Sequence, residues 1–116
     1  MDKVIIGGVE YTPKSNTAEK LNDMKYVIIR AYSAGVFAGY LEVKEGQNVI
    51  LRNARRLWKW VGAASLSQLA MEGVSRPDEC KFPCEVDRIE IDQVVEVIDC
   101  TQKAKDSIAE VKIWEA

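Results

Sequence analysis

A chain of 116 residues with 47% hydrophobic and 29% charged side chains can bury one modest core, and this composition excludes a disordered protein. Sixteen basic and eighteen acidic side chains give a net charge of −2, so the overall field does not draw the protein to nucleic acid or to an anionic membrane. The chain has no histidine, which excludes Ser-His-Asp and Cys-His catalysis and every histidine-ligated metal site.

The first 24 residues differ in character from the rest of the chain. A short apolar run at residues 4–6 leads into Gly7-Gly8 and then into a polar stretch, so residues 1–24 predict an N-terminal arm with an edge strand. The run is too short for a secretory signal, and no segment approaches the roughly 18 apolar residues of a membrane span. We therefore expect a cytoplasmic protein with a single globular domain at residues 25–116.

Three segments after residue 25 favour β-strands. Residues 26–32, 36–44 and 49–60 are rich in β-branched and aromatic side chains, and turn residues separate them. Gly35 fits a tight turn, Gly39 fits a bulge, and residues 45–48 fit a second turn. A helix is the alternative structure for residues 49–60.

The second half of the chain predicts two helices around a further pair of strands. Ser65 can cap a short helix that ends at Gly73, and Thr101 fits the N-cap of a final helix through Lys112. Residues 86–91 and 94–98 return to strand-like alternation. The buried stripes of the two helices are predicted to be Leu66, Leu69 and Ala70, and Ala104, Ile108 and Val111. The predicted fold class is α+β, mainly β: an antiparallel meander with one short middle helix and a C-terminal helix.

The densest group of cationic and aromatic side chains lies between residues 52 and 60, where nine residues hold three arginines, a lysine and two tryptophans. Arginine forms paired hydrogen bonds with phosphate or carboxylate, and an indole ring offers a stacking surface. In a strand, alternation would place Arg52, Arg56, Trp58 and Trp60 on one face. We therefore expect a binding surface for a small anionic, nucleotide-like ligand. Its predicted residues are Arg30, Tyr32, Arg52, Arg55, Arg56, Trp58 and Trp60.

Other roles for the same residues remain open at this point. Trp58 and Trp60 are also typical of core positions covered by arginine stems. Tryptophan, tyrosine and arginine are enriched at the centres of protein–protein interfaces, so a protein-binding module is the alternative function. Nucleic-acid binding is a third possibility. It would be weak, because a single basic patch on an acidic protein gives only salt-sensitive affinity.

Catalytic and metal-binding patterns are weak in this sequence. The chain has three cysteines, Cys80, Cys84 and Cys100, and this odd number favours reduced thiols over disulfides. Three thiolates would also leave a tetrahedral zinc ion one ligand short. Acidic pairs such as Glu90 with Asp92 are typical of a solvated strand face. We expect that the protein is not an enzyme and that it binds neither a metal nor another cofactor. A sheet with exposed edges and little helical cover predicts a homo-oligomer.

Several short motifs of the chain are distinctive together. They are Tyr32-Ser33-Ala34-Gly35-Val36, Gly39-Tyr40-Leu41, Glu45-Gly46, Asn53-Ala54-Arg55-Arg56-Leu57-Trp58-Lys59-Trp60, Gly62-Ala63, Leu66, Glu72-Gly73-Val74 and the stretch 89–100. With these motifs, residues 26–105 resemble a family of small uncharacterised proteins that is common in tailed-phage and prophage genomes. The resemblance implies a phage-encoded protein in the host cell, and it carries no established function. In that setting, a nucleotide-binding surface would sequester a signal of host defence, and a protein-binding surface would inhibit a host or phage protein.

Overall fold

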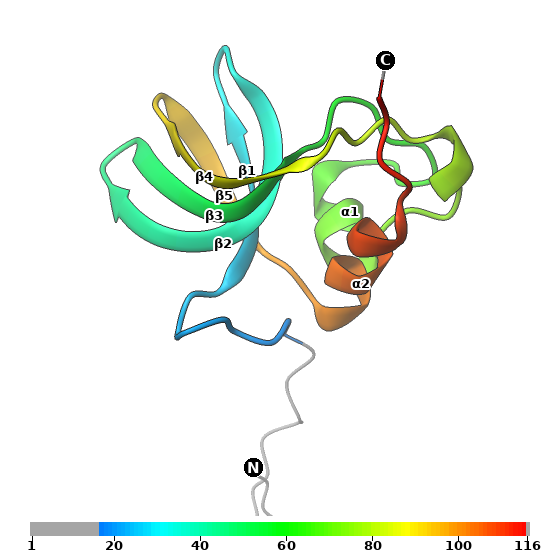
Figure 1. The fold of residues 1–116 in the computed structure, drawn as a ribbon, viewed down its shortest axis with the longest axis horizontal. Helices are drawn as coiled ribbons and strands as arrows, with labels where there is room; N and C mark the ends of the chain where they lie inside the picture. The colour runs from blue at the N-terminus through cyan, green and yellow to red at the C-terminus, as the bar shows by residue number, and fades with distance from the viewer. Residues whose placement is uncertain (1–16, 116) are drawn as a thin grey trace, which may run out of the picture.

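The computed structural model describes residues 17–115 and shows an antiparallel sheet with two helices against one of its faces (Figure 1). The strands lie in the order β4-β3-β2-β1-β5, so the first strand is paired with both the second and the last. The strands are β1 Tyr26–Ala31, β2 Gly35–Glu45, β3 Asn48–Arg56, β4 Glu85–Ile91 and β5 Val94–Asp99. The helices are α1 Leu66–Glu72, the 3₁₀ turn η1 Pro77–Glu79 and α2 Gln102–Glu110. The prediction of a mainly β, α+β meander with a middle and a C-terminal helix is confirmed.

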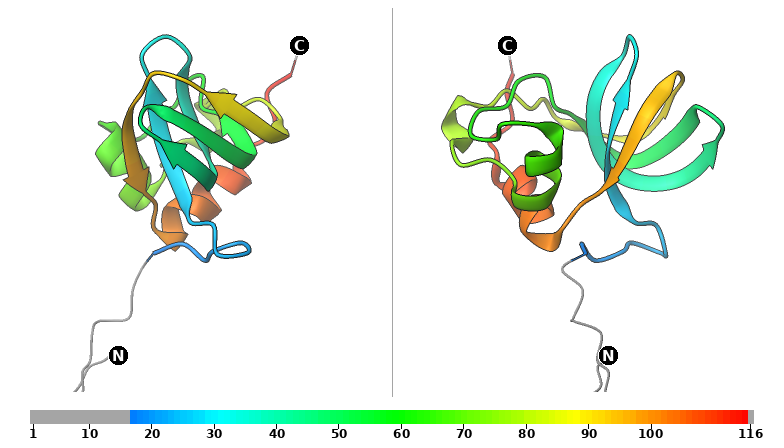
Figure 2. Two further views of the ribbon diagram at one scale, coloured as in Figure 1. Left: turned by 90° about the vertical axis from the view of Figure 1, so that its left-hand side faces the viewer. Right: turned by 180° about the vertical axis from the view of Figure 1, so that it is seen from behind.

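The sheet curls strongly, and the helices lie together on one side of it (Figure 2). This arrangement gives two separate groups of buried side chains. The helix-side core joins Ile28, Leu57, Phe82 and Ile108 to the inner faces of both helices. The sheet core comes from the strands alone and includes Ile29, Phe37, Val49 and Leu51. The central strands of the sheet are therefore buried on both faces.

Both helices begin at the residues that the sequence predicts. The Ser65 hydroxyl accepts a hydrogen bond from the amide of Gln68 at 3.2 Å, and the Thr101 hydroxyl accepts one from the amide of Ala104 at 3.0 Å. The first helix ends at Gly73, where φ is 79° and an added Cβ would overlap the side chain of Ser107. Glycine at this position therefore allows the end of α1 to lie directly against α2.

The third strand is shorter than predicted and is interrupted by a bulge. It ends at Arg56, so Trp58 and Trp60 lie beyond it. Asn53 has a φ of 51°, and Asn53 together with Ala54 faces the single residue Gly39 of β2. Gly39 is needed here because a Cβ would lie 3.1 Å from the Cα of Ala54. The bulge predicted from Gly39 is present.

The bulge changes which residues share a face of β3. Before it, Val49 and Leu51 belong to the sheet core, and after it Ala54 does. Strict alternation across residues 49–60 therefore fails, and the expectation that Arg52 and Arg56 lie on one face is wrong. Arg52 pairs with Tyr40, which packs against the helix-side core, whereas Arg56 pairs with Phe37 of the sheet core.

The N-terminal arm is only partly covered by these observations. Residues 4–6, where the edge strand is predicted, lie outside the described residues. Of the described part, Ala18 is buried, and its amide donates to the carbonyl of Cys100 at 3.0 Å. No helix among the described residues is long and apolar enough to cross a membrane.

Candidate functional site

A surface pocket of about 210 Å³ lies where the turn between β1 and β2 meets the chain that leaves β3. We call it the turn pocket. A backbone hydrogen bond of 2.9 Å from the amide of Leu57 to the carbonyl of Val36 holds its two sides together. Its lining residues are Ser33, Ala34, Gly35, Val36, Arg56, Leu57, Trp58 and Trp60. Three residues of the predicted binding surface, Arg56, Trp58 and Trp60, are therefore brought together.

The guanidinium of Arg56 is held in place from two sides. Its Nη1 donates to the carbonyl of Ala34 at 2.7 Å, and its Cζ lies 4.3 Å from the centre of the Phe37 ring. The side chain is exposed, and within residues 17–115 it forms no ion pair with a carboxylate. Arg56 therefore presents an oriented positive charge with unused N–H donors at the rim of the turn pocket.

The aromatic residues of the predicted site have different environments. Trp58 is 65% exposed and Tyr32 is 81% exposed, so neither is a core residue. Trp60 is half-buried and packs against the helix-side core. Tyr32 precedes the turn that lines the pocket, and its amide donates to the carbonyl of Gln93 at 2.9 Å. The core interpretation thus applies in part to Trp60 and does not apply to Trp58.

Arg30 and Arg52 each have an acidic partner. The Nε of Arg30 lies 3.0 Å from Oε1 of Glu96, and Nη1 of Arg52 lies 3.5 Å from Oε1 of Glu42. Arg30 is the cross-strand partner of Val36 and so lies one strand from the turn pocket. Arg52 lies before the bulge and does not line the pocket. The positive charge available at the turn pocket is therefore chiefly that of Arg56.

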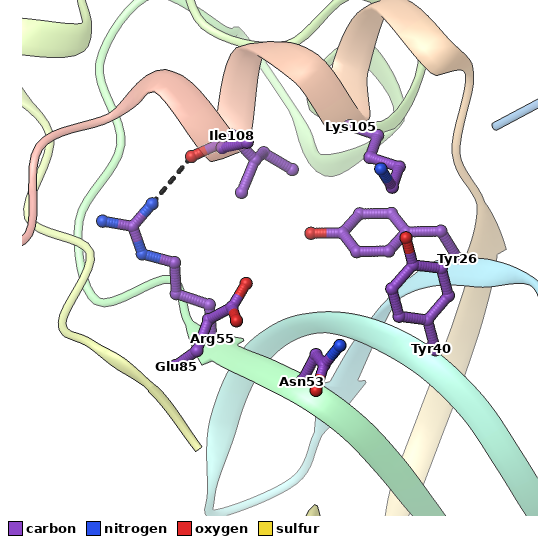
Figure 3. A pocket seen from close by; sticks show the side chains of 8 residues that line it. Tyr26, Tyr40, Asn53, Arg55, Glu85, Lys105 and Ile108 are labelled. Carbon is purple, nitrogen blue, oxygen red and sulfur yellow. Dashed lines mark hydrogen bonds between the residues drawn. The ribbon is translucent and has the colours of Figure 1, made fainter. Parts of the chain in front are cut away.

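Arg55 is buried, with 5% of its surface exposed, and its donors are used inside the protein. No carboxylate pairs with it among the described residues, and its hydrogen bonds of 2.7–3.0 Å all go to backbone carbonyls. The carbonyls belong to Phe82, Pro83, Ile108 and Val111. Burial lowers the pKa of the Arg55 guanidinium from its ordinary value. Figure 3 shows this side chain reaching from β3 to the end of α2. The structure assigns Arg55 a structural role.

A second pocket, of about 140 Å³, lies between the sheet and α2 (Figure 3). We call it the polar cavity. It is lined by Tyr26, Tyr40, Asn53, Arg55, Glu85, Lys105, Ile108 and Ala109. Arg55 is the one member of this set that belongs to the binding surface predicted from the sequence, because the others are scattered over four strands and a helix. The one local signal was the grouping of Tyr40 and Asn53 within the distinctive motifs.

Among the residues that line the polar cavity, Tyr26 has the most strongly shifted pKa. Only 7% of its surface is exposed, and burial raises the pKa of its hydroxyl well above the usual range, with smaller contributions from the charges of Cys100 and Glu85. The Tyr26 hydroxyl therefore stays protonated and remains a neutral hydrogen-bond donor.

The three cysteines are free thiols in different surroundings. Cys80 and Cys100 are buried and Cys84 is exposed. Burial raises the pKa of Cys100 to about 12, with a further contribution from the charge of Asp99. A buried, protonated thiol such as that of Cys100 behaves as a small hydrophobic side chain.

Comparison with known proteins identifies the family. No curated protein and no solved structure matches the chain. A family model described as a domain of unknown function (DUF6948) matches residues 24–108. This match spans the whole turn pocket and all of the polar cavity except Ala109. The chain therefore belongs to the DUF6948 family.

Proposed function

We propose that the protein is a non-enzymatic binding protein whose turn pocket holds a planar, negatively charged ligand of the nucleotide type. The observation that carries the proposal is the position of Arg56 between the Ala34 carbonyl and the Phe37 ring, beside two tryptophans. A guanidinium without an acidic partner attracts phosphate or carboxylate, and the neighbouring indoles offer stacking surfaces for a base.

The size of the turn pocket limits how such a ligand would lie. Pockets that enclose a drug-sized molecule have volumes of roughly 300–1,000 Å³, and the turn pocket has about 210 Å³. One ring would enter the pocket, and the charged part would remain outside it beside Arg56. In a phage-encoded protein of the host cytoplasm, binding of this kind would sequester a nucleotide signal of host defence.

A second candidate function, a protein–protein interaction module, is favoured by the exposure of Tyr32 and Trp58. Large aromatic side chains that are mostly exposed beside an oriented arginine are typical of interface hot spots. In this alternative, Trp58 would enter a pocket on a host or phage protein, and Arg56 would bind a carboxylate of that protein.

The ultraviolet spectrum of the purified protein is the first test of the nucleotide proposal. A 260 nm excess that survives gel filtration and leaves on denaturation supports it. Titration with AMP should then quench tryptophan fluorescence, because two of the three tryptophans line the pocket.

Two variants and a matched control sharpen this test. Trp58→Ala should abolish AMP binding, and Arg56→Lys should weaken it about tenfold because lysine lacks the planar fork. Arg52→Lys, at an exposed arginine outside the pocket, should leave binding unchanged. A protein that carries no 260 nm excess and shows no saturable quenching with AMP refutes nucleotide binding.

A further inference from the structure

The polar cavity lies on the helix side of the sheet and has no part in the proposed function. Figure 3 shows the hydroxyl of Tyr26, the carboxylate of Glu85 and the side-chain amide of Asn53 directed into one space. Asn53 reaches this position because the bulge of β3 gives it a left-handed backbone, with φ of 51°. Such backbone conformations cost free energy and occur often at ligand sites.

Five of the polar side chains around the cavity form no hydrogen bond or ion pair with one another. In the part of the chain that the structure describes, no hydrogen bond or ion pair involves the side chains of Tyr26, Tyr40, Asn53, Glu85 or Lys105. Tyr26 matters most, because more than nine-tenths of its surface is buried. A buried hydroxyl without a partner destabilises the ligand-free protein, so a guest that accepts its hydrogen bond recovers the lost free energy.

The charges of Lys105 and Glu85 have opposite signs and lie on opposite sides of the cavity (Figure 3). The Lys105 ammonium lies 5.8 Å and 5.7 Å from the ring centres of Tyr26 and Tyr40, which themselves meet edge to face at 5.1 Å. These rings hold the ammonium at one side by cation–π contact. The Glu85 carboxylate lies at the other side, where its cross-strand neighbour Arg55 also lines the cavity. The Arg55 guanidinium donates to backbone carbonyls, so Glu85 is the charged group available to a guest at that side.

We propose that the polar cavity binds a small zwitterion of the amino-acid type, with its carboxylate toward Lys105 and Tyr26 and its ammonium toward Glu85. A guest with both charges pairs with both Lys105 and Glu85, whereas a guest with a single charge leaves one of them without a partner. The volume of about 140 Å³ agrees with this class. At about 30 Å³ per water molecule it corresponds to about four or five waters, which suits glycine, alanine or serine and is too small for a nucleotide.

Titration of the full chain with glycine and L-alanine, followed by NMR, tests the proposal. The side-chain NH₂ signals of Asn53 should shift and saturate at millimolar concentrations of either amino acid. Acetate and methylammonium, which each carry one of the two charges, should produce no saturable shift at the same concentrations. The turn pocket does not share these residues, so this result and the AMP titration succeed or fail separately.

Variants with a matched control decide whether the cavity is the site. Tyr26→Phe removes only the hydroxyl and should weaken L-alanine binding about tenfold, without lowering the melting temperature of the ligand-free protein, because the hydroxyl it removes has no protein partner. Lys105→Met should weaken binding at least as much. Lys103→Met, an exposed lysine of the same helix, should leave it unchanged. The proposal is overturned if neither amino acid gives a saturable shift, if acetate alone binds as well as glycine, or if Lys103→Met weakens binding as much as Lys105→Met.

Discussion

Two neighbouring arginines of β3 lie in opposite environments. Arg55 donates to four carbonyls, two of which, those of Ile108 and Val111, lie at the C-terminal end of α2. The carbonyl end of a helix carries a partial negative charge, so a buried guanidinium is favourable there without a carboxylate. Arg56 is exposed, and within residues 17–115 its side chain makes one hydrogen bond, to the carbonyl of Ala34. A single step along the chain thus separates a residue that fixes the fold from a residue available to a ligand.

Replacing Arg55 should destabilise the protein far more than replacing Arg56. Arg55→Met leaves three buried carbonyls and one part-buried carbonyl without their donors and should lower the free energy of unfolding by about 3–5 kcal/mol. Arg55→Lys should recover little, because one ammonium cannot reach the same set of carbonyls. Arg56→Met is the matched control and should cost less than about 1 kcal/mol. Urea unfolding measures all three, and equal midpoints for Arg55→Met and Arg56→Met would contradict the structural role of Arg55.

The contact between the two helices depends on how the first helix ends. Gly73 adopts a φ of 79° and lies against Ser107 of α2, whose hydroxyl also accepts a hydrogen bond from the amide of Val74 at 3.0 Å. At the other end, the Thr101 hydroxyl donates to the carbonyl of Met71 at 2.6 Å. The end of α1 is therefore hydrogen-bonded to Thr101 at the start of α2 and to Ser107 two turns later. These two contacts leave little space between the end of α1 and α2.

Gly73→Ala tests this packing. It should cost about 2–4 kcal/mol, because it combines an unfavourable positive φ with overlap against Ser107. Gly46→Ala is the control for backbone strain alone, since Gly46 has a φ of 58° and an added Cβ would meet nothing within 4 Å. The control should cost about 1–2 kcal/mol. Thermal unfolding that gives equal losses for the two variants would show that crowding at Ser107 is unimportant.

At the scale of the whole molecule, two buried acids connect stability to pH. The pKa of Cys100 is raised from 9.0 to about 12, and that of Tyr26 is raised from 10.0, in both cases chiefly by burial. Below pH 9 both groups are protonated in the folded and unfolded chains. Above pH 9 the unfolded chain loses these protons first, so rising pH favours unfolding.

Stability should accordingly be lost as pH rises from about 9 toward 12. Each group contributes up to about 1.4 kcal/mol per pH unit in its window. Cys100→Ala should reduce the slope between pH 9 and 10, measured from urea midpoints, whereas Cys84→Ala should not, because Cys84 is exposed. Identical slopes for the two variants would show that the Cys100 thiol is not the group that titrates.

The sequence predicts those parts of the structure that depend on residues close together in the chain. Ser65 and Thr101 cap their helices through residues three positions away, and the turns at Gly35 and Gly46 bound β2, so the fold class and the helix starts follow from short stretches. The environment of Arg55 depends on carbonyls 27 to 56 residues away, which no spacing reveals. The sequence predicts part of the turn pocket, because Arg56, Trp58 and Trp60 are close together in the chain. It does not predict the polar cavity, because the lining residues of that cavity come together only when the sheet packs against α2.

The bulge at Asn53 has a consequence for changes in chain length. Relative to β2, Asn53 is one inserted residue, yet the pairing of β3 with β4 runs without interruption from Val49 opposite Ile91 to Arg55 opposite Glu85. Asp87 of β4 is therefore the companion insertion. Deleting Asn53 alone would remove this bulge from the pairing with β2 and shift β4 by one residue, whereas deleting Asn53 and Asp87 together would keep β4 in register with β3. Natural length variants of this domain should consequently gain or lose these two distant residues as a pair, and a double deletion should unfold at a higher urea concentration than either single deletion.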